Sequence, residues 1–317
     1  MQQFRTQLFG GGFSGNFLQQ LYSCFLLRLQ FVQPDWFKQY ISVKPEHHTC
    51  QVEGATIAYQ HWKNPGKPAL LFVHGQAAHA HWWDFIAPAF LADYDVVAID
   101  NSGSGESDHR TEYSAALFAR ELVACIKAAH LTSPIVVGHS FGGTMTRIAA
   151  HLYPEQLDSI VIVDSALPPK KPSREPLPVP KVKSRYYKSM EEGKRRFRLR
   201  PPQPCDNKFI IDYLAGHSLK KTSEGFKFKL DVAVFAKMAL TEEFPAAADM
   251  VRDMRIPVGF IYGEKSRFFP SAVAGELALI LDSTLVRAVP DAYHHVFLDQ
   301  PLSFIEALKD LLYQLSR

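Results

Sequence analysis

The sequence predicts an α/β fold in which a mainly parallel, twisted sheet is flanked by helices. Short, continuous apolar runs, such as residues 69–73 and 95–99, alternate with longer segments whose apolar residues recur at helical spacing. Strands that are buried on both faces have this continuous apolar pattern. Strands that alternate with helices pair in parallel through crossover connections. The length of 317 residues suits one large domain with an insertion, or two smaller domains.

The composition is that of an ordinary globular protein. Hydrophobic residues make up 47% of the chain and charged residues 21%, which are usual values. The net charge of +3 is small and gives no reason to expect a nucleic-acid partner. No apolar run is long enough to predict a transmembrane segment.

The four cysteines, Cys24, Cys50, Cys125 and Cys205, are scattered and form no Cys-x-x-Cys pair. This spacing favours reduced thiols in a reducing compartment over a disulfide framework or a zinc site. We therefore expect a cytoplasmic protein.

The N-terminal extension, residues 1–48, contains a segment rich in Leu and Phe at 17–32. Gln19, Gln20, Arg28 and Gln30 interrupt it, and no small-residue cleavage site follows. This pattern favours an amphipathic docking helix over a signal peptide. The helix could instead contact a membrane surface, although its polar face has a single cation.

The remaining elements follow in chain order. The predicted strands are 49–52 and 55–61, which form a hairpin, then 69–73, 95–99, the β-branched run that begins at 135, 160–163, 258–262 and 285–289. Helical spacing predicts a helical segment opened by Trp82 and Trp83, and helices over 114–129, 144–153 and 301–315.

The alternation of strands and helices is interrupted between residues 167 and 247. This interval has a proline-rich start and several helical pieces, without buried-strand patterns. We predict a helical lid at 167–247, inserted into an α/β core made of 49–166 and 248–317.

The first part of the lid is strongly basic. Between residues 167 and 230 there are 17 Lys or Arg and 6 Asp or Glu, whereas the rest of the chain has 18 against 26. A solvated helical face explains this bias. A lid that attracts an anionic substrate, or that rests on an acidic surface, explains it as well.

The candidate nucleophile is Ser140. It lies in the sequence Gly138-His139-Ser140-Phe141-Gly142, between a β-branched run and a helical pattern. A G-x-S-x-G sequence in this position is typical of a nucleophile elbow, where the serine projects from a sharp turn over a helix N-terminus. A chance match in a glycine-rich turn is the alternative.

The candidate base is His294. A serine needs a base to remove its proton and an acid to orient that base, and in open α/β sheets the reacting groups gather at the carboxyl ends of the strands. His294 and His295 follow the strand at 285–289. We prefer His294 for its spacing to Asp299 and Pro301, and expect His295 to be a structural neighbour.

The oxyanion hole requires backbone N–H donors close to the nucleophile. One is expected from Phe141, which follows the serine. The other is expected from Gln76, in the turn that begins with His74-Gly75. His74 itself is expected to stabilise this turn and not to act as a base.

Together, these motifs resemble the α/β-hydrolase fold superfamily in its serine hydrolase branch. They are His74-Gly75, Gly103-x-Gly105-x-Ser107, the elbow at Ser140, and the late His294 with Asp299 and Pro301. The resemblance covers about residues 49–317, and the lid lies at the usual place after the sixth strand. It specifies the fold more closely than the reaction.

The acid departs from the family pattern. Members of the family usually have it after the seventh strand in a G-x-x-D turn, but here Ser266 replaces the aspartate after Gly263. Haloalkane dehalogenases of the same fold have the acid after the sixth strand, in a context that Asp164 to Pro168 resembles. We therefore predict Asp164. Glu264 and the absence of any acid, which would leave a binding pocket, are the alternatives.

Three other carboxylates are expected to be structural. Asp100 would cap the turn at 102–106. Asp291 is too near His294 in sequence to orient it, and Asp299 would be the N-cap of the last helix.

The predicted activity is hydrolysis of a carboxylic ester by Ser140, His294 and Asp164 through an acyl-enzyme. An apolar ester is expected, in a pocket with Trp82, Trp83 and the lid aromatics; these aromatics could equally form the core of the lid. Carbon–carbon bond hydrolysis, thioester or lactone hydrolysis, and weakly catalytic ligand binding are the alternatives. No metal or cofactor motif is present, and the sequence gives no oligomeric state.

Overall fold

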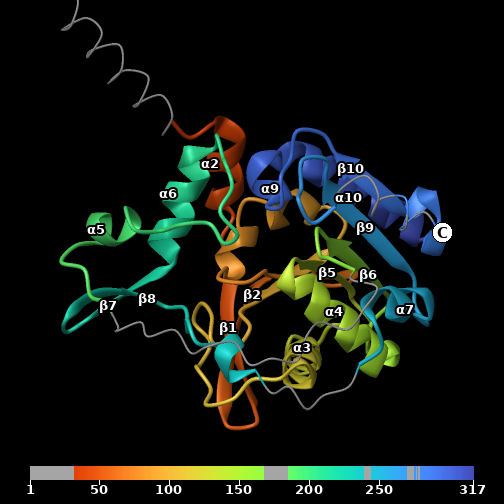
Figure 1. Cartoon of the computed structure of the whole chain (residues 1–317), viewed down its shortest axis with the longest axis horizontal. Helices are drawn as coiled ribbons and strands as arrows, with labels where there is room; N and C mark the ends of the chain where they lie inside the picture. The colour runs from red at the N-terminus through yellow and green to blue at the C-terminus, as the bar shows by residue number, and fades with distance from the viewer. Residues whose placement is uncertain (1–31, 168–184, 239–243, 270–274, 276, 278) are drawn as a thin grey trace, which may run out of the picture.

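A computed structural model describes residues 32–167, 185–238, 244–269, 275, 277 and 279–317 (Figure 1). The N-terminal helix predicted at 17–32 lies outside these residues, apart from its last position. In the described part of the extension a short helix, α2 (Asp35–Ser42), is present. It packs the buried side chain of Phe37 against the core. Within the described residues, no helix has both the length and the apolar character needed to cross a membrane.

The main sheet has eight strands in the order β1-β2-β4-β3-β5-β6-β9-β10. The β1–β2 and β2–β4 pairs are antiparallel, and all the other pairs are parallel. The prediction of a mainly parallel sheet is therefore confirmed. The strands are β1 (Glu46–Val52), β2 (Ala55–Trp62), β3 (Ala69–Val73), β4 (Asp95–Ile99), β5 (Ile135–His139), β6 (Ser159–Val163), β9 (Val258–Gly263) and β10 (Val286–Val289).

Helices cover both faces of this sheet (Figure 1). The expected helical segment at Trp82 and Trp83 is a short 3-10 helix, η1 (Ala80–Trp83). The predicted helix at 114–129 is observed with Ser114 as its N-cap, whose hydroxyl accepts a hydrogen bond from the Leu117 amide. This helix is α3 (Ala115–Ala128). Other α-helices of the core are α4 (Phe141–Leu152), α7 (Ala247–Arg252), α9 (Val296–Asp299) and α10 (Pro301–Leu315).

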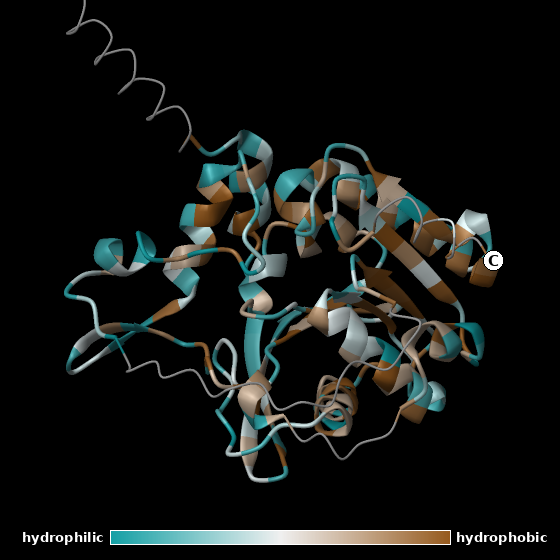
Figure 2. Cartoon of the chain, in the orientation of Figure 1, coloured by the Kyte–Doolittle hydropathy of each residue, from teal (hydrophilic) through white to brown (hydrophobic). Residues whose placement is uncertain are grey.

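Alternating side chains of the central strands divide the apolar core in two. Leu70 and Phe72 of β3 pack on the side of α10, whereas Leu71 and Val73 pack on the side of α3 and α4. Side chains of successive strand residues point to opposite faces, so every residue of β3 is buried. This explains the continuous apolar runs in the sequence, which appear as hydrophobic central strands in Figure 2.

The inserted segment is not entirely helical. It contains α5 (Met190–Lys194) and α6 (Lys208–His217), but also an antiparallel pair, β7 (Leu219–Thr222) and β8 (Gly225–Phe228). The insertion that we predicted as a helical lid therefore also contains a short antiparallel pair of strands. These two strands are mostly exposed or half-buried, so they lack the continuous apolar run that marks a core strand. All four elements lie on one side of the molecule (Figure 1).

Three of the four cysteines, Cys50, Cys125 and Cys205, lie in the described part of the chain, and all three are free thiols. Burial raises the pKa of the Cys205 thiol to about 12. Cys24 lies outside the described residues.

The junction of β5 and α4 has no room for a side chain at Gly138. A Cβ atom there would lie 2.3 Å from Thr146 Oγ1 and 2.6 Å from the carbonyl oxygen of Gly142. The second contact is with backbone, so a side-chain rotation cannot relieve it.

We expect Gly138→Ala to lower the free energy of unfolding by about 2 kcal/mol, because the extra methyl group overpacks this junction. Gly216→Ala is the matched control. It lies within α6, where an added Cβ meets nothing within 4 Å, and the better helix propensity of Ala should stabilise it by about 0.5–1 kcal/mol. Urea unfolding measures both, and equal effects would contradict the packing argument.

Candidate active site

Ser140 occupies a strained turn between β5 and α4. Its backbone has φ 54° and ψ −119°, a combination that is rare for residues other than glycine. The Ser140 amide donates to the carbonyl of Val163 at 2.8 Å. A Cβ at Gly142 would lie 2.4 Å from the carbonyl oxygen of His74, so the turn requires glycine there. The predicted strand–turn–helix is present.

The three residues proposed from sequence meet at the carboxyl edge of the sheet. His294 Nε2 lies 2.8 Å from Ser140 Oγ, and His294 Nδ1 lies 2.8 Å from Asp164 Oδ1. A carboxylate oxygen accepts, so the Nδ1–H donates and the Nε2 lone pair faces the hydroxyl. This arrangement can withdraw the proton of Ser140.

Asp164 is fully buried at the end of β6. Besides His294, it accepts a hydrogen bond from the Ser266 hydroxyl at 2.6 Å and another from the Gly263 amide at 2.9 Å. The serine that stands in the usual place of the acid therefore donates to the carboxylate from the neighbouring strand. Glu264 is exposed, and no hydrogen bond joins it to His294 in the described part of the chain.

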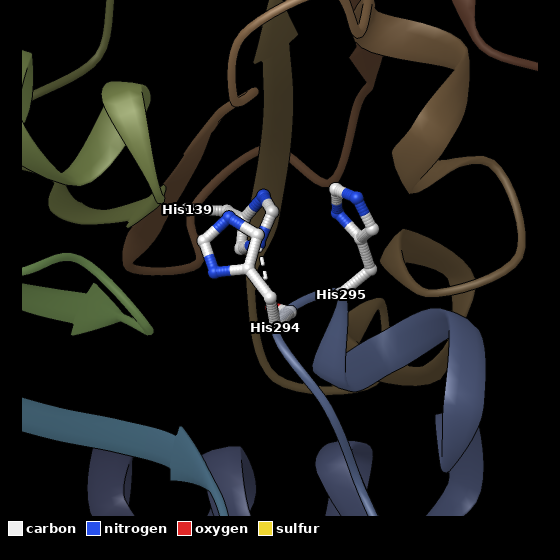
Figure 3. A group of neighbouring side chains, drawn as sticks. All are labelled: His139, His294 and His295. Atoms are coloured by element: carbon white, nitrogen blue, oxygen red, sulfur yellow. Dashed lines mark hydrogen bonds between the residues drawn. The ribbon is translucent and has the colours of Figure 1, made fainter. Parts of the chain in front are cut away.

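Two further histidines, His139 and His295, lie next to His294 (Figure 3). His139 donates from Nε2 to the carbonyl of His294 at 3.0 Å, and His295 donates from Nε2 to the carbonyl of Pro201 at 3.2 Å. Burial, with the neighbouring His294, holds the pKa of His139 well below its usual range and lowers that of His295 to about 3. Both rings are therefore neutral neighbours of the base, as expected for His295.

The rings of His139, His294 and His295 could together bind a metal ion, since one nitrogen from each lies within 4.8 Å of the others. The Nδ1 atoms of His139 and His295 have no partner among the described residues. Both nitrogens of His294, however, are already engaged with Ser140 and Asp164. A metal at this position would therefore disrupt the hydrogen bonds of the base.

Asp299 supports the loop of the base, which corrects its expected role as a helix cap. Gln300 is the N-cap of α10 and makes no side-chain cap. Asp299 Oδ2 instead accepts from the Tyr293 amide and from Gln203 Nε2, both at 2.8 Å. Gln203 Oε1 in turn accepts from the His295 amide at 2.9 Å. Burial raises the pKa of Asp299 to about 6.

Gln203 was not predicted from the sequence. It lies more than 90 residues from its two partners, so no local motif marks it. Its contacts connect the inserted segment to the loop that carries His294.

The other structural assignments agree with the geometry. His74 donates from Nδ1 to the Gly75 carbonyl and accepts from the Asn101 amide at Nε2, which fixes the turn. Asp100 accepts from the amide of Glu106, and also from that of Ala80. Asp291 is an exposed partner of Lys265.

Two neighbouring cavities lie between the core and the inserted segment. The first is lined by both expected oxyanion donors, Gln76 and Phe141, and by an apolar group, whereas Ser140 and His294 do not belong to its lining. The second is the larger of the two. The apolar lining of the first cavity consists of Phe118, Leu230, Val232, Val234 and Phe235.

Trp82 and Trp83 line neither cavity, which corrects their expected place in a substrate pocket. They are 2% and 0% exposed. Trp83 stacks on Phe72 and on Phe297, with ring centroids 4.6 and 4.5 Å apart. Their large apolar rings thus contribute to the core on the α10 side of the sheet.

A second group of titratable side chains joins α6 to the core. Asp84 Oδ2 accepts from His81 at 2.7 Å and from the Tyr213 hydroxyl at 2.5 Å. The His217 ring lies against that of His81, with centroids 3.9 Å apart. Burial, and next the neighbouring His81, lowers the pKa of His217 to about 4.

The fold and this geometry define the class of protein: a mainly parallel α/β sheet with a serine, a histidine and a carboxylate hydrogen-bonded in series at its carboxyl edge. A sequence model of the α/β hydrolase fold matches residues 68–301. The chain therefore belongs to the α/β hydrolase family.

The relatives have different activities. The chain is 31% identical to a putative esterase/lipase of Haemophilus influenzae over 97 residues, 31% of the chain and 34% of that protein. It is 24% identical to the 2-(acetamidomethylene)succinate hydrolase of Mesorhizobium japonicum over 77% of the chain and 88% of that enzyme. Several curated relatives are matched over less than half of their own length.

Solved structures agree with the fold. The thioesterase domain from the curacin biosynthetic pathway superposes with a TM-score of 0.67, covering 84% of this chain and 99% of that domain. Its sequence identity is 19%, so the likeness concerns the fold alone.

We expect the protein to lose stability as the pH falls from about 6.5 toward 4. The folded-state pKa of His217 and of His295 lies below the ordinary value of about 6.5, so the unfolded chain binds these protons first and gains stability relative to the fold. His217→Gln should reduce the loss between pH 7 and pH 5, and His151→Gln, at an exposed position, should not. Thermal unfolding at both pH values measures this, and identical pH slopes in the two variants would contradict it.

Proposed function

We propose that the protein is a serine hydrolase that cleaves carboxylic esters, with Ser140 as nucleophile, His294 as general base and Asp164 as the acid that orients it. The observation that carries the proposal is the continuous series of hydrogen bonds from Asp164 through His294 to Ser140. Its members come from the ends of β5 and β6 and from the loop after β10, which are separate parts of the chain. Such a series activates a serine hydroxyl.

The reaction follows from this geometry. His294 Nε2 takes the hydroxyl proton as Ser140 Oγ bonds to the ester carbonyl carbon. The N–H groups of Gln76 and Phe141 stabilise the resulting oxyanion, together with the N-terminal end of α4. The imidazolium returns its proton to the leaving alcohol as the carbon–oxygen bond breaks. Water, deprotonated by the same histidine, then releases the acid from Ser140.

The substrate is proposed to have an apolar part next to Ser140, because Phe118, Leu230, Val232, Val234 and Phe235 line the cavity that contains both oxyanion donors. The ester assignment is supported by the named esterase/lipase among the relatives. Thioester, lactone and carbon–carbon bond hydrolysis use the same nucleophile and base, and remain outcomes for a substrate screen.

We also propose roles for the inserted segment and for the N-terminal extension. Residues 167–247 act as a lid over the core formed by 49–166 and 248–317. The N-terminal extension, 1–48, docks on the protein through the helix predicted at 17–32. The free thiols of Cys50, Cys125 and Cys205 support a reducing compartment, in agreement with a cytoplasmic location.

We expect a fluorophosphonate probe to label Ser140, because an activated serine attacks the phosphorus centre whereas an ordinary serine does not. Peptide mass spectrometry should place the adduct on Ser140 in the native protein, and Ser140→Ala should remove it. Heat-denatured protein is the control for chemical reactivity without the folded site. An unlabelled but folded protein would favour the alternative of a binding protein.

We expect Asp164→Asn to lower kcat for 4-nitrophenyl acetate by about 10³- to 10⁴-fold, because an amide cannot hold the imidazole in the required tautomer. Glu264→Gln should leave kcat within about twofold of the wild-type value, since that side chain is exposed. Circular dichroism of both variants establishes that they fold. A larger loss in Glu264→Gln than in Asp164→Asn would assign the acid to Glu264.

A further inference from the structure

The two cavities lie next to each other. Ala77, Arg200, Leu230 and Val232 line both of them. The first cavity contains the proposed oxyanion donors, whereas the second extends between the core turn at 77–79 and the inserted segment. A substrate whose carbonyl lies at the proposed oxyanion donors of the first cavity can therefore reach the second cavity past these shared residues.

The second cavity has a cationic lining. Arg196, Arg198, Arg200 and Lys229 all border it, and none of the described residues that line it is Asp or Glu. The first cavity differs, because its apolar lining is accompanied by Asp231 as well as Arg200. The lining of the second cavity is therefore more positively charged than that of the first.

The arginines of this lining are available for a ligand. Lys229 is buried and pairs with Glu106, and one terminal nitrogen of Arg198 donates to the carbonyls of Arg195 and Phe197. For Arg196 and Arg200, the described part of the chain offers no ion-pair partner. Their guanidinium groups can donate two parallel hydrogen bonds to one carboxylate or phosphate.

The second cavity brings together cations from two parts of the inserted segment. Arg196, Arg198 and Arg200 precede α6, whereas Lys229 follows β8. A concave site lined by charges of one sign concentrates ions of the opposite sign.

We propose that the second cavity is an anion subsite, which binds a carboxylate or phosphate group at the end of the substrate away from the scissile ester. This inference rests on the proposed function, because it places the ester carbonyl at Ser140. Arg196 and Arg200 are the residues that recognise the anionic group, and Lys229 adds to the positive potential. The substrate is then an ester with an apolar part near Ser140 and an anionic end.

The test compares esters that differ in their acyl ends: neutral 4-nitrophenyl butyrate, mono-4-nitrophenyl glutarate with a carboxylate, and 4-nitrophenyl 4-phosphonobutanoate with a phosphonate. At low salt we expect the wild type to have a kcat/KM at least tenfold higher for one or both anionic esters than for the butyrate. The larger ratio identifies the preferred anion. In the double variant Arg196→Gln/Arg200→Gln, the ratio should fall to about one, mainly through a higher KM.

Arg252→Gln is the matched control. It removes one exposed arginine at the end of α7, outside both cavities, and should keep the wild-type ratio. The ratio of the wild type should also decline as NaCl is raised to 0.5 M, because salt screens charges in a solvent-accessible site. A wild-type ratio near one, or an equal ratio in the double variant, would overturn the subsite.

A separate measurement distinguishes this proposal from the ester chemistry. If no ester is hydrolysed, glutarate and inorganic phosphate can be titrated calorimetrically into the wild type and the double variant. Binding that the double variant loses would retain the subsite and reject the hydrolase. The absence of binding of both anions would overturn the subsite.

Discussion

The carboxylate of Asp164 is the interaction on which the rest of the site depends. It is fully buried, and a buried charge is costly unless hydrogen bonds compensate it. Three donors do so: His294, the Ser266 hydroxyl and the Gly263 amide. Because they come from the ends of β9 and from the loop after β10, a single carboxylate holds three neighbouring strand ends in register. The same bonds that satisfy the charge also orient the ring that faces Ser140.

Much of the fold could be predicted because burial on both faces leaves a simple pattern. The ends of β3, β4 and α10 agree with the residues predicted for them, since a continuous apolar run or a regular helical spacing ends where burial ends. The β7–β8 pair was missed because its residues are mostly exposed or half-buried. Helix α2 was missed for a related reason: it buries little besides Phe37, so its apolar pattern is short.

The parts of the site that could be predicted are those where the local backbone geometry requires a particular residue type. The turn at Ser140 demands glycine at 142, because backbone lies within 2.4 Å of any Cβ there, and such constraints produce a motif. Gln203 and Asp299 have no equivalent, since their contact joins residues 96 positions apart. Trp82 and Trp83 were misplaced because sequence cannot distinguish an aromatic side chain in a pocket from one in the core. Asp164 could be proposed as the acid only because it follows a strand adjacent to the usual one.

The inserted segment combines two tasks within a few residues. Pro201 and Gln203 contact His295 and Asp299, next to the base, while Arg200 lines both cavities. An anion held by Arg200 would therefore act on the chain one residue before the contacts that position the loop of His294. The inserted segment thus joins the proposed anion subsite to the loop that carries His294 within the stretch 200–203.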